Sequence, residues 1–244
     1  MDINIRRFSV WYAHCEELSI EQAIERGEAD IVWPKLAYVP AMQRRRLSPF
    51  AKMALLVANQ SVTAIDDPLP IVFSSRHGDL PKTSTLLADL AEKNALSPTT
   101  FGLSVHNAIP SLFSILTNNK QAINAISAGQ DSFMMGLVDV YSRLKSGLAA
   151  EILFIYADQK LPDTYLGFQD EQQISHALAM LVSLPSEQTT TGDDKTISFH
   201  FEHFIQSITA AMPASLLFSQ WFNSTQQQLA LSSNHYNWRL NKHV

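Results

Sequence analysis

Residues 120–133 combine a short apolar stretch, a turn of small residues and the start of a helix, in the sequence KQAINAISAGQDSF. Such a joint is typical of a nucleophile elbow, in which a side chain is presented at a helix N-terminus that favours its ionised form. We call residues 124–129 the elbow. Ile126 cannot attack an acyl group, whereas Ser127 carries a hydroxyl that a base could activate. The elbow therefore either lacks a nucleophile or uses Ser127.

A nucleophile at Ser127 needs a histidine as its base, and His77 or His106 are the candidates. The residues around Ser127 do not form the Gly-x-Ser-x-Gly motif of a hydrolase elbow. A Ser127-dependent thioesterase or other hydrolase is therefore an alternative that the local sequence argues against.

Composition narrows the class of protein. The 244 residues are 46% hydrophobic and 17% charged, which is enough apolar material for one substantial core. A net charge of -5 indicates no nucleic-acid partner. Cys15 is the single cysteine, which excludes an internal disulfide and a cysteine-rich metal site, and we expect neither cofactor nor metal. No apolar run reaches the roughly 20 residues of a membrane span and no signal peptide is evident, so we expect a cytoplasmic protein.

Strand-like and helix-like stretches alternate along the chain, which predicts an α/β layered fold in a single domain over residues 1–244. Ser19 with Gln22 forms a capping-box pattern, and Ser48 before Pro49 marks a second helix start. The predicted strands are residues 8–14, 69–74, 121–126, 151–157 and 198–204, and the predicted helices are residues 19–27, 50–63, 83–94, part of 97–117, 129–144 and 219–231.

Three segments form an ordered set of motifs: VFSSRHGDL at 72–80, SPTTFGLSVHN at 97–107 and the elbow sequence NAISAG. Together they resemble the N-terminal half of β-ketoacyl synthases, in which the elbow pattern is Thr-Ala-Cys-x-x-Gly. The resemblance covers residues 8–184. It implies a thiolase-like layered fold, a single N-terminal half with a central mixed sheet flanked by helices.

By this resemblance, Ile126 takes the position of the acyl-accepting cysteine. A ketosynthase is a tandem of two similar halves, and its catalytic histidines and lysine come from the second half, for which this chain has too few residues. The histidines between residues 200 and 243 lack the matching glycine-rich settings. Without groups that stabilise the enolate and the oxyanion, condensation cannot be assembled. The resemblance thus implies a subunit that is not an enzyme on its own.

The family match is with shortened β-ketoacyl-synthase-like proteins encoded with aryl polyene pathways, which resemble the chain-length factors of type II polyketide synthases. Such a factor forms a heterodimer with an active β-ketoacyl synthase, and an acyl carrier protein reaches it through the complex. The implied role is to shape the acyl tunnel in polyketide, aryl polyene or fatty-acid-type elongation. A purely structural stabiliser of a ketosynthase is the remaining alternative.

The resemblance also implies where the partner binds. The strands leading into the two elbows pair in antiparallel fashion, and an uncovered apolar edge strand is a liability in any protein. His106 and Asn107 are equally consistent with a helix cap. The expected interface residues are Asn107, Gln121, Ala122, Ile123, Asn124, Ala125 and Ile126.

The residue matching Thr100 projects towards the partner's acyl tunnel, and the one matching His77 lies beside the chain's own tunnel. Phe113 and Leu116, at helical spacing, are equally consistent with core packing. The expected tunnel residues are Arg76, His77, Thr100, Phe101, Leu112, Phe113 and Leu116.

The last segment, residues 198–244, is rich in aromatic residues, which bury a large area each. We expect this tail to fold back over the surface where a second half would have packed. Its aromatic residues include Phe199, Phe201, Phe204, Phe218, Trp221, Phe222 and Trp238.

Overall fold

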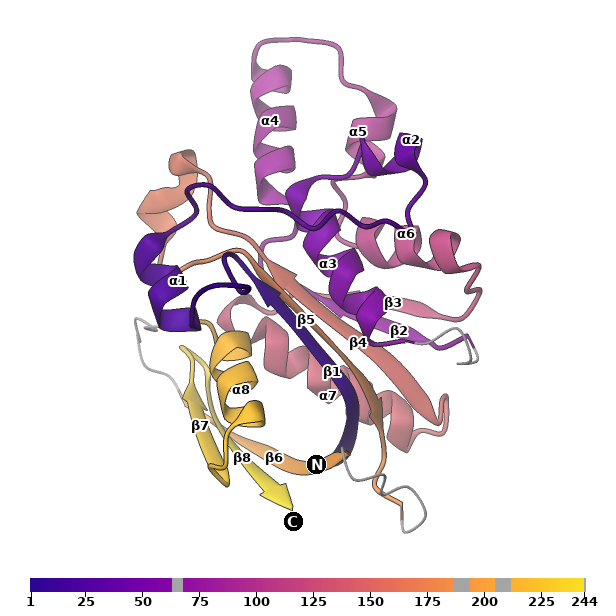
Figure 1. Cartoon of the computed structure of the whole chain (residues 1–244), viewed down its shortest axis with the longest axis vertical. Coiled ribbons are helices and arrows are strands. Elements are labelled where there is room, and N and C mark those ends of the chain that lie inside the picture. Colours follow the sequence, from indigo (N-terminus) through magenta and orange to yellow (C-terminus); the bar gives the residue numbers. More distant parts are fainter. Residues whose placement is uncertain (63–67, 187–193, 205–211, 244) are drawn as a thin grey trace.

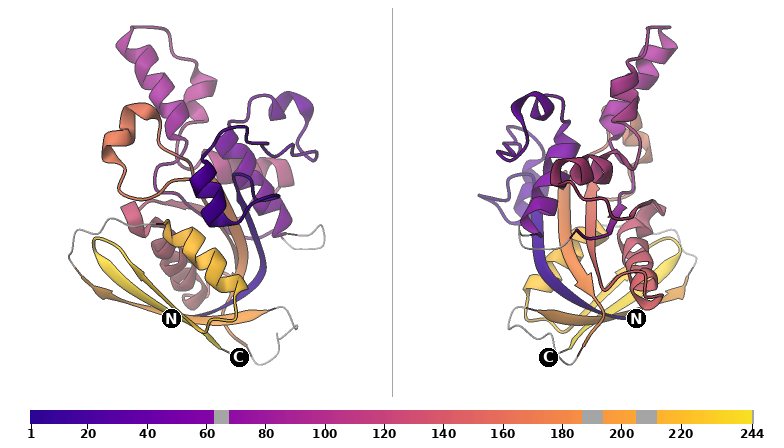
Figure 2. Two further views of the ribbon diagram at one scale, coloured as in Figure 1. Left: turned by 60° about the vertical axis from the view of Figure 1, so that its left-hand side comes forward. Right: turned by 90° about the vertical axis from the view of Figure 1, so that its right-hand side faces the viewer.

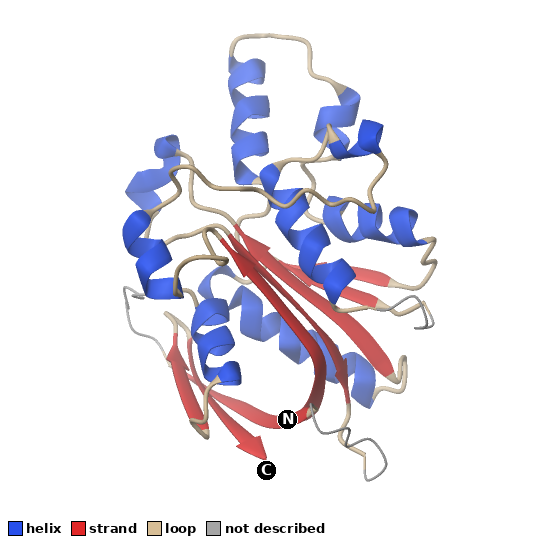
Figure 3. Ribbon diagram, viewed as in Figure 1, coloured by secondary structure: helices blue, strands red, loops and turns tan. Residues whose placement is uncertain are grey.

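A mixed sheet of eight strands organises the part of the chain that the structure, a computed structural model, describes: residues 1–62, 68–186, 194–204 and 212–243. The strand order is β3-β2-β4-β5-β1-β6-β8-β7, and helices lie on both faces (Figure 1, Figure 3). The α/β layered fold with a central mixed sheet is confirmed. The strands are β1 (Asp2–Tyr12), β2 (Ile71–Ser74), β3 (Ile123–Ile126), β4 (Glu151–Asp158), β5 (His176–Ser183), β6 (Lys195–His203), β7 (Gln228–Ser232) and β8 (Tyr236–His243). The helices are α1 (Ile20–Arg26), α2 (Ala41–Arg44), α3 (Pro49–Gln60), α4 (Leu80–Ala91), α5 (Pro98–Gly102), α6 (Ala108–Thr117), α7 (Ser132–Lys145) and α8 (Ala214–Asn223), with the 3-10 helices η1 (Gly129–Asp131) and η2 (Asp163–Phe168).

The sheet is parallel at one end and antiparallel over the rest. β2 pairs in parallel with β3 and β4, whereas the pairs from β4–β5 through β8–β7 are antiparallel. β4 and β5 are buried along nearly their whole length, because helices cover both faces of the sheet there. β3 is one edge of the sheet and β7 is the other.

Two apolar layers hold the helices to the sheet. α3 and α6 pack on one face with side chains such as Phe73 and Ile155, and α7 and α8 pack on the other with Val72 and Phe154. Neighbouring strand residues thus face opposite layers, as the period of two requires. α7 approaches the sheet closely at Gly136, where a Cβ atom would lie 2.6 Å from the Phe154 ring. Glycine there allows the elbow helix to sit against β4.

Helix starts were predicted correctly where a capping side chain marks them. The Ser19 hydroxyl accepts from the Gln22 N–H, and the Gln22 side chain accepts from the Ser19 N–H. The Ser48 hydroxyl caps α3 by accepting from the Ala51 N–H at 3.1 Å. α3 ends at Gln60 rather than at the predicted residue 63, which lies outside the described residues.

Some boundaries differ from the prediction. β1 starts at Asp2 instead of residue 8, because Ile3 and Ile5 are buried where β1 pairs with β5 and β6. α4 starts at Leu80 instead of residue 83, with Pro81 in its first turn.

The tail, residues 198–244, differs most from the predicted secondary structure. The predicted helix 219–231 is wrong in its second half, because α8 ends at Asn223 and β7 follows. Leu229 and Leu231 alternate with polar or small residues and pair with β8, so tertiary pairing decides the conformation. β5 and β8 were not predicted at all.

The tail packs onto α7, as Figure 2 illustrates for α8 and the β6–β8–β7 strands. Phe218 lies 5.0 Å from Phe133 of α7, measured between ring centroids. Phe201 and Phe204, at 39% and 37% exposure, remain outside this core. That the tail replaces a missing second half stays a prediction. The buried tail aromatics are Phe199, Phe218, Trp221, Phe222 and Trp238.

Candidate functional site: the elbow and the edge strand

The elbow is a tight joint between β3 and α7. Gly129 has φ +59°, a left-handed conformation that favours glycine. The Ser132 hydroxyl donates to the Gly129 carbonyl at 2.7 Å and accepts from the Ala128 N–H at 2.9 Å, which closes the turn. Ser74, at the end of β2, donates to the Ser132 carbonyl at 2.6 Å. The start of α7 is thus fixed from two strands.

Ile126 ends β3 with its side chain packed towards α7 and its carbonyl hydrogen-bonded. The side chain is half-buried and packs against the apolar cluster around α7. Its carbonyl accepts from the Ser75 N–H at 3.2 Å and lies 2.8 Å from His106 Nε2, which must therefore donate. The elbow presents a saturated hydrocarbon side chain at this position, with no group that can attack an acyl thioester.

Ser127 is exposed, and its hydroxyl donates to the Arg76 carbonyl at 3.0 Å. Within the described residues no imidazole hydrogen-bonds to this hydroxyl, and His106 already donates its Nε2 proton to a carbonyl. His77 Nε2 is buried without a hydrogen-bond partner in the same part of the chain. The hydrolase alternative needs a nucleophile bonded to its base, and this geometry does not support it.

The loop after β2 is held by one buried carboxylate at the end of β4. Asp158 accepts from the Ser75 hydroxyl at 3.1 Å and from the Arg76 and His77 N–H groups at 2.9 and 3.0 Å. The Tyr156 hydroxyl also donates to it, at 2.5 Å. Asp158 therefore fixes the backbone that carries two of the expected tunnel residues.

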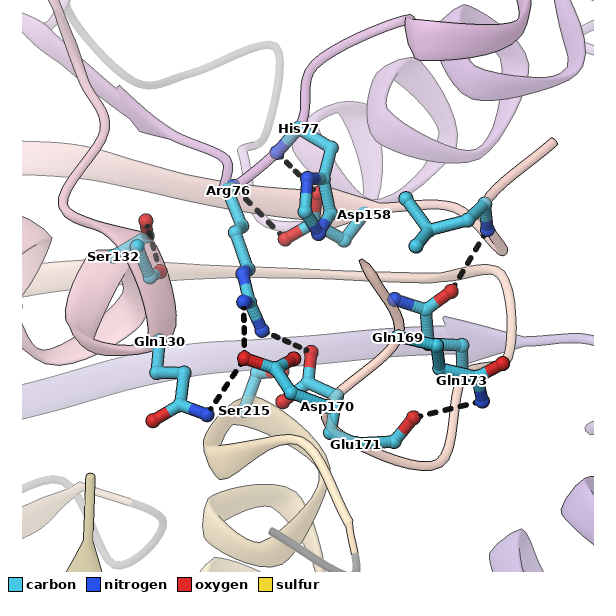
Figure 4. Close-up of polar contacts among 12 residues, drawn as sticks. Arg76, His77, Gln130, Ser132, Asp158, Gln169, Asp170, Glu171, Gln173 and Ser215 are labelled. Atoms are coloured by element: carbon cyan, nitrogen blue, oxygen red, sulfur yellow. Dashed lines mark hydrogen bonds and ion pairs between the residues drawn. The ribbon is translucent and has the colours of Figure 1, made fainter. Parts of the chain in front are cut away.

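The Arg76 guanidinium points away from that backbone into a cluster of acidic groups (Figure 4). It lies 2.8 Å from Asp170 and 3.2 Å from Glu171. Burial raises the pKa of Glu171 to about 7; the charges of Asp158 and Asp170 add to the rise, and the charge of Arg76 opposes it. Burial also acts on Asp170, but its hydrogen bond to Arg76 and the charge of that group lower its pKa. Burial lowers the pKa of His77.

The tail is fastened to the elbow by polar contacts. The buried Asp131 carboxylate accepts from Trp238 Nε1 and from the Ser233 hydroxyl, each at 2.7 Å. Gln130 donates to Asp170 at 2.9 Å and accepts from the Asn234 N–H at 3.0 Å. Elbow, acidic cluster and tail therefore form one connected network.

The expected tunnel residues fall into three separate places. Arg76 and His77 lie in the polar cluster beneath the elbow. Phe113, at 2% exposure, belongs to the core between the sheet and helices α3 and α6. Leu112 and Leu116, also on α6, are partly buried and pack against the same core. Thr100 and Phe101 lie on α5, where Phe101 is 56% exposed. A tunnel role for these residues stays a prediction.

The expected interface strand is the edge strand β3. Ile123 and Ala125 pack towards α3 and α6, whereas Asn124 donates to Asp139 of α7 at 3.0 Å. Asn107 is the N-cap residue of α6, as the helix-cap interpretation expects, but its side chain makes no capping hydrogen bond there. Of the remaining expected residues, Gln121 and Ala122 are exposed just before the strand and Ile126 ends it.

Sequence reasoning missed the acidic cluster. Asp158 ends a buried apolar strand that neighbours β2, and polar groups at the carboxyl ends of adjacent parallel strands meet at one edge of a sheet. That pattern was available in the sequence. Asp170 and Glu171 lie in an irregular segment after η2, and no local pattern placed them beside Arg76.

The layered sheet, together with an elbow at the end of a parallel edge strand, defines a ketosynthase-type domain of thiolase-like fold. Residues 18–241 match the family described as beta-ketoacyl synthase, N-terminal domain, and the chain belongs to this family. No curated protein matches the chain. Among the described residues, no helix is both long and apolar enough to cross a membrane.

Solved structures have the same fold. A ketosynthase (ApeO) in complex with its chain length factor (ApeC) from Xenorhabdus doucetiae matches with TM-score 0.78 and 22% identity, over 99% of each chain. A type II polyketide synthase acyl-carrier protein in complex with its ketosynthase (AntDE:AntF) matches with TM-score 0.68 and 10% identity, over 98% of this chain and 99% of that one. The ishigamide ketosynthase/chain length factor matches with TM-score 0.58 and 14% identity, over 69% of this chain and 52% of that one.

Proposed function

We propose that this chain is a non-catalytic, chain-length-factor-like subunit that forms a heterodimer with an active β-ketoacyl synthase. The observation that carries the proposal is Ile126, an apolar side chain at the end of the edge strand, where this family presents its nucleophile. Likeness in fold to chains of ketosynthase and chain-length-factor complexes supports it. In this role the partner supplies the cysteine and the catalytic histidines, and an acyl carrier protein delivers substrate to the complex.

The contact with the partner is made through β3. A four-residue edge strand with apolar side chains is an unpaired template, and a second strand laid beside it satisfies its free backbone groups. Antiparallel pairing with the partner's corresponding strand makes one continuous sheet of the two subunits. The fixed elbow behind β3 keeps that strand in place.

The chain's second task is to limit product length in polyketide or aryl polyene elongation. Thr100 and Phe101 of α5 are the residues that reach a partner's acyl tunnel, and the exposure of Phe101, which is more than half, is consistent with this role. A growing acyl chain that meets a bulky wall can extend only by overpacking, at a cost of about 1–3 kcal/mol. Such a cost slows extension about 5- to 150-fold.

A purely structural role is the second candidate, and the burial of Phe113 favours it. A side chain that is 2% exposed in the core of the chain stabilises the fold without touching substrate. The two roles differ in whether variants of α5 change the length of the product or only the amount of complex.

Reconstituted elongation tests the proposal. A candidate ketosynthase from the same genome is assayed with acyl- and malonyl-carrier-protein substrates, alone and with this chain, and products are measured by mass spectrometry. We expect condensation only when both chains are present, and no turnover by this chain alone. Thioester cleavage by the isolated chain, abolished by Ser127→Ala, would refute the proposal in favour of the hydrolase.

A further inference from the structure

The hairpin formed by β7 and β8 in the tail meets the elbow, although the two belong to opposite edges of the sheet. β3 is one edge strand and β7 is the other. The strands β6, β8 and β7 curve round so that their apolar side chains join those of α7 in one core (Figure 2). The turn of the hairpin, residues 233–235, thereby reaches η1, the 3-10 turn that follows β3.

One side chain of η1 holds this hairpin. The Asp131 carboxylate accepts from Trp238 Nε1 and from the Ser233 hydroxyl, each at 2.7 Å. The same hydroxyl accepts from the His235 and Tyr236 N–H groups at 3.2 and 3.0 Å. The oxygen atom that shapes the hairpin turn is therefore the one that binds the elbow.

The burial of Asp131 makes the elbow depend on these contacts. Its side chain is 3% exposed, and among the described residues it forms no ion pair and no capping hydrogen bond to α7. A carboxylate is stable in such a place only when hydrogen-bond donors replace water. Both side-chain donors come from the hairpin. Without them Asp131 has to turn to water, and η1 has to move with it.

The end of β3 moves whenever η1 moves. β3 has four residues and pairs with β2 alone, so its position depends on what holds its ends. Residues 127–130 are all that separate Ile126 from Asp131, and Ile126 packs against the apolar cluster that contains Trp238. The contacts from β2 hold one side of the elbow, and the hairpin holds the other.

We propose that Asp131 and Trp238 are positioning residues for the strand that binds the partner. Through the hydrogen bond between them the tail hairpin fixes η1, and η1 fixes the end of β3 in the conformation that pairs with the ketosynthase. The proposal rests on the proposed function, because it takes the partner and the pairing strand from there. It gives the tail a part in partner recognition, although the tail lies at the opposite edge of the sheet.

Two tryptophan variants of the complete chain test this assignment. Trp238→Phe keeps an aromatic ring in the core and deletes the N–H that donates to Asp131. Trp221→Phe is the matched control, since Trp221 is 3% exposed in the same apolar cluster and its N–H has no hydrogen-bond partner among the described residues. Both changes shorten a buried indole to a phenyl ring, so a difference between them reports the hydrogen bond to the elbow.

The readout is the affinity of the folded chain for the ketosynthase, measured by calorimetry. We expect Trp238→Phe to bind more than tenfold more weakly and Trp221→Phe to bind within twofold of the wild type. Asp131→Ala combined with Trp238→Phe binds no more weakly than Asp131→Ala alone, because the two groups act through one bond. Equal binding by the two tryptophan variants, whatever their melting temperatures, would make the bond merely structural. That result would overturn the proposal and leave the proposed function standing.

Hydrogen–deuterium exchange of the unaltered, free chain gives a second readout that does not depend on a variant's folding. The Ala128 and Asp131 amides are hydrogen-bonded within the elbow, and the Tyr236 amide within the hairpin turn. We expect these amides to open together, with protection that falls in parallel as urea is added. Elbow amides protected more than tenfold less than that of Tyr236 would overturn the proposal. Absence of any complex with the wild type refutes the proposed function itself, and with it the strand contact that the proposal requires.

Discussion

Replacing Ala125 with proline removes one hydrogen-bond donor from the open edge of the sheet. The Ile71 N–H donates to Ala122 and the Ser75 N–H donates to Ile126, so the even-numbered residues of β3 direct their backbone groups towards β2. Alternate residues of a parallel strand bond to the same neighbour, which leaves the N–H of Ala125 pointing away from β2. Proline at such a position costs the chain no internal ladder bond.

The expected effect is on the complex. The partner's carbonyl opposite Ala125 loses its donor, and a buried unsatisfied carbonyl costs about 1–3 kcal/mol. Since every 1.4 kcal/mol is tenfold in affinity, Ala125→Pro weakens binding about 5- to 150-fold.

The assay is the dissociation constant for the ketosynthase, together with thermal unfolding of the free chain. Ala125→Val, which keeps the N–H, is the matched control and retains wild-type affinity. Asn124→Pro is the reciprocal variant: it removes a donor to β2 and lowers the stability of the free chain. Wild-type affinity of a folded Ala125→Pro chain would show that β3 does not pair with the partner.

Three further outcomes are expected. Between pH 4.5 and about 7 the native chain keeps a proton on Glu171 that the unfolded chain has lost, so the free energy of unfolding falls by about 3 kcal/mol as pH rises through this window. Glu171→Gln removes most of this pH dependence, as measured by urea unfolding at pH 5 and pH 8. An unchanged pH dependence in the variant contradicts the assignment to Glu171. Gly136→Ala forces its Cβ against the buried Phe154 ring and lowers the free energy of unfolding by about 1–3 kcal/mol despite alanine's better helix propensity; a raised melting temperature would argue against that close contact. Phe101→Ala lengthens the products of the reconstituted complex, as read by mass spectrometry, whereas unchanged products made by a weaker complex favour scaffolding.

Local chemistry was predictable from sequence where one or two residues determine it. A serine at the N-cap position fixes a helix start, because its hydroxyl accepts from the backbone N–H three residues later, as at Ser19 and Ser48. The small residues at 127–129 marked the elbow because only such residues allow so sharp a turn. These features depend only on neighbouring residues in the chain, so they can be predicted without knowledge of the fold.

Features that depend on distant residues were not predictable. β7 forms because β8 pairs with it, although the glutamines at 226–228 that lead into it are good helix formers. Arg76 meets Asp170 across 94 positions of sequence, and Asp131 meets Trp238 across 107. Such contacts follow from the way distant segments pack together, which no local pattern encodes.

The stoichiometry of the complex tests the central claim most directly. The chain and a candidate ketosynthase are co-expressed, and the species eluted from size exclusion is weighed by light scattering. The account predicts a one-to-one heterodimer that elongates acyl-carrier-protein substrates, while this chain alone is inert. A chain that elutes by itself and cleaves thioesters without a partner would contradict it.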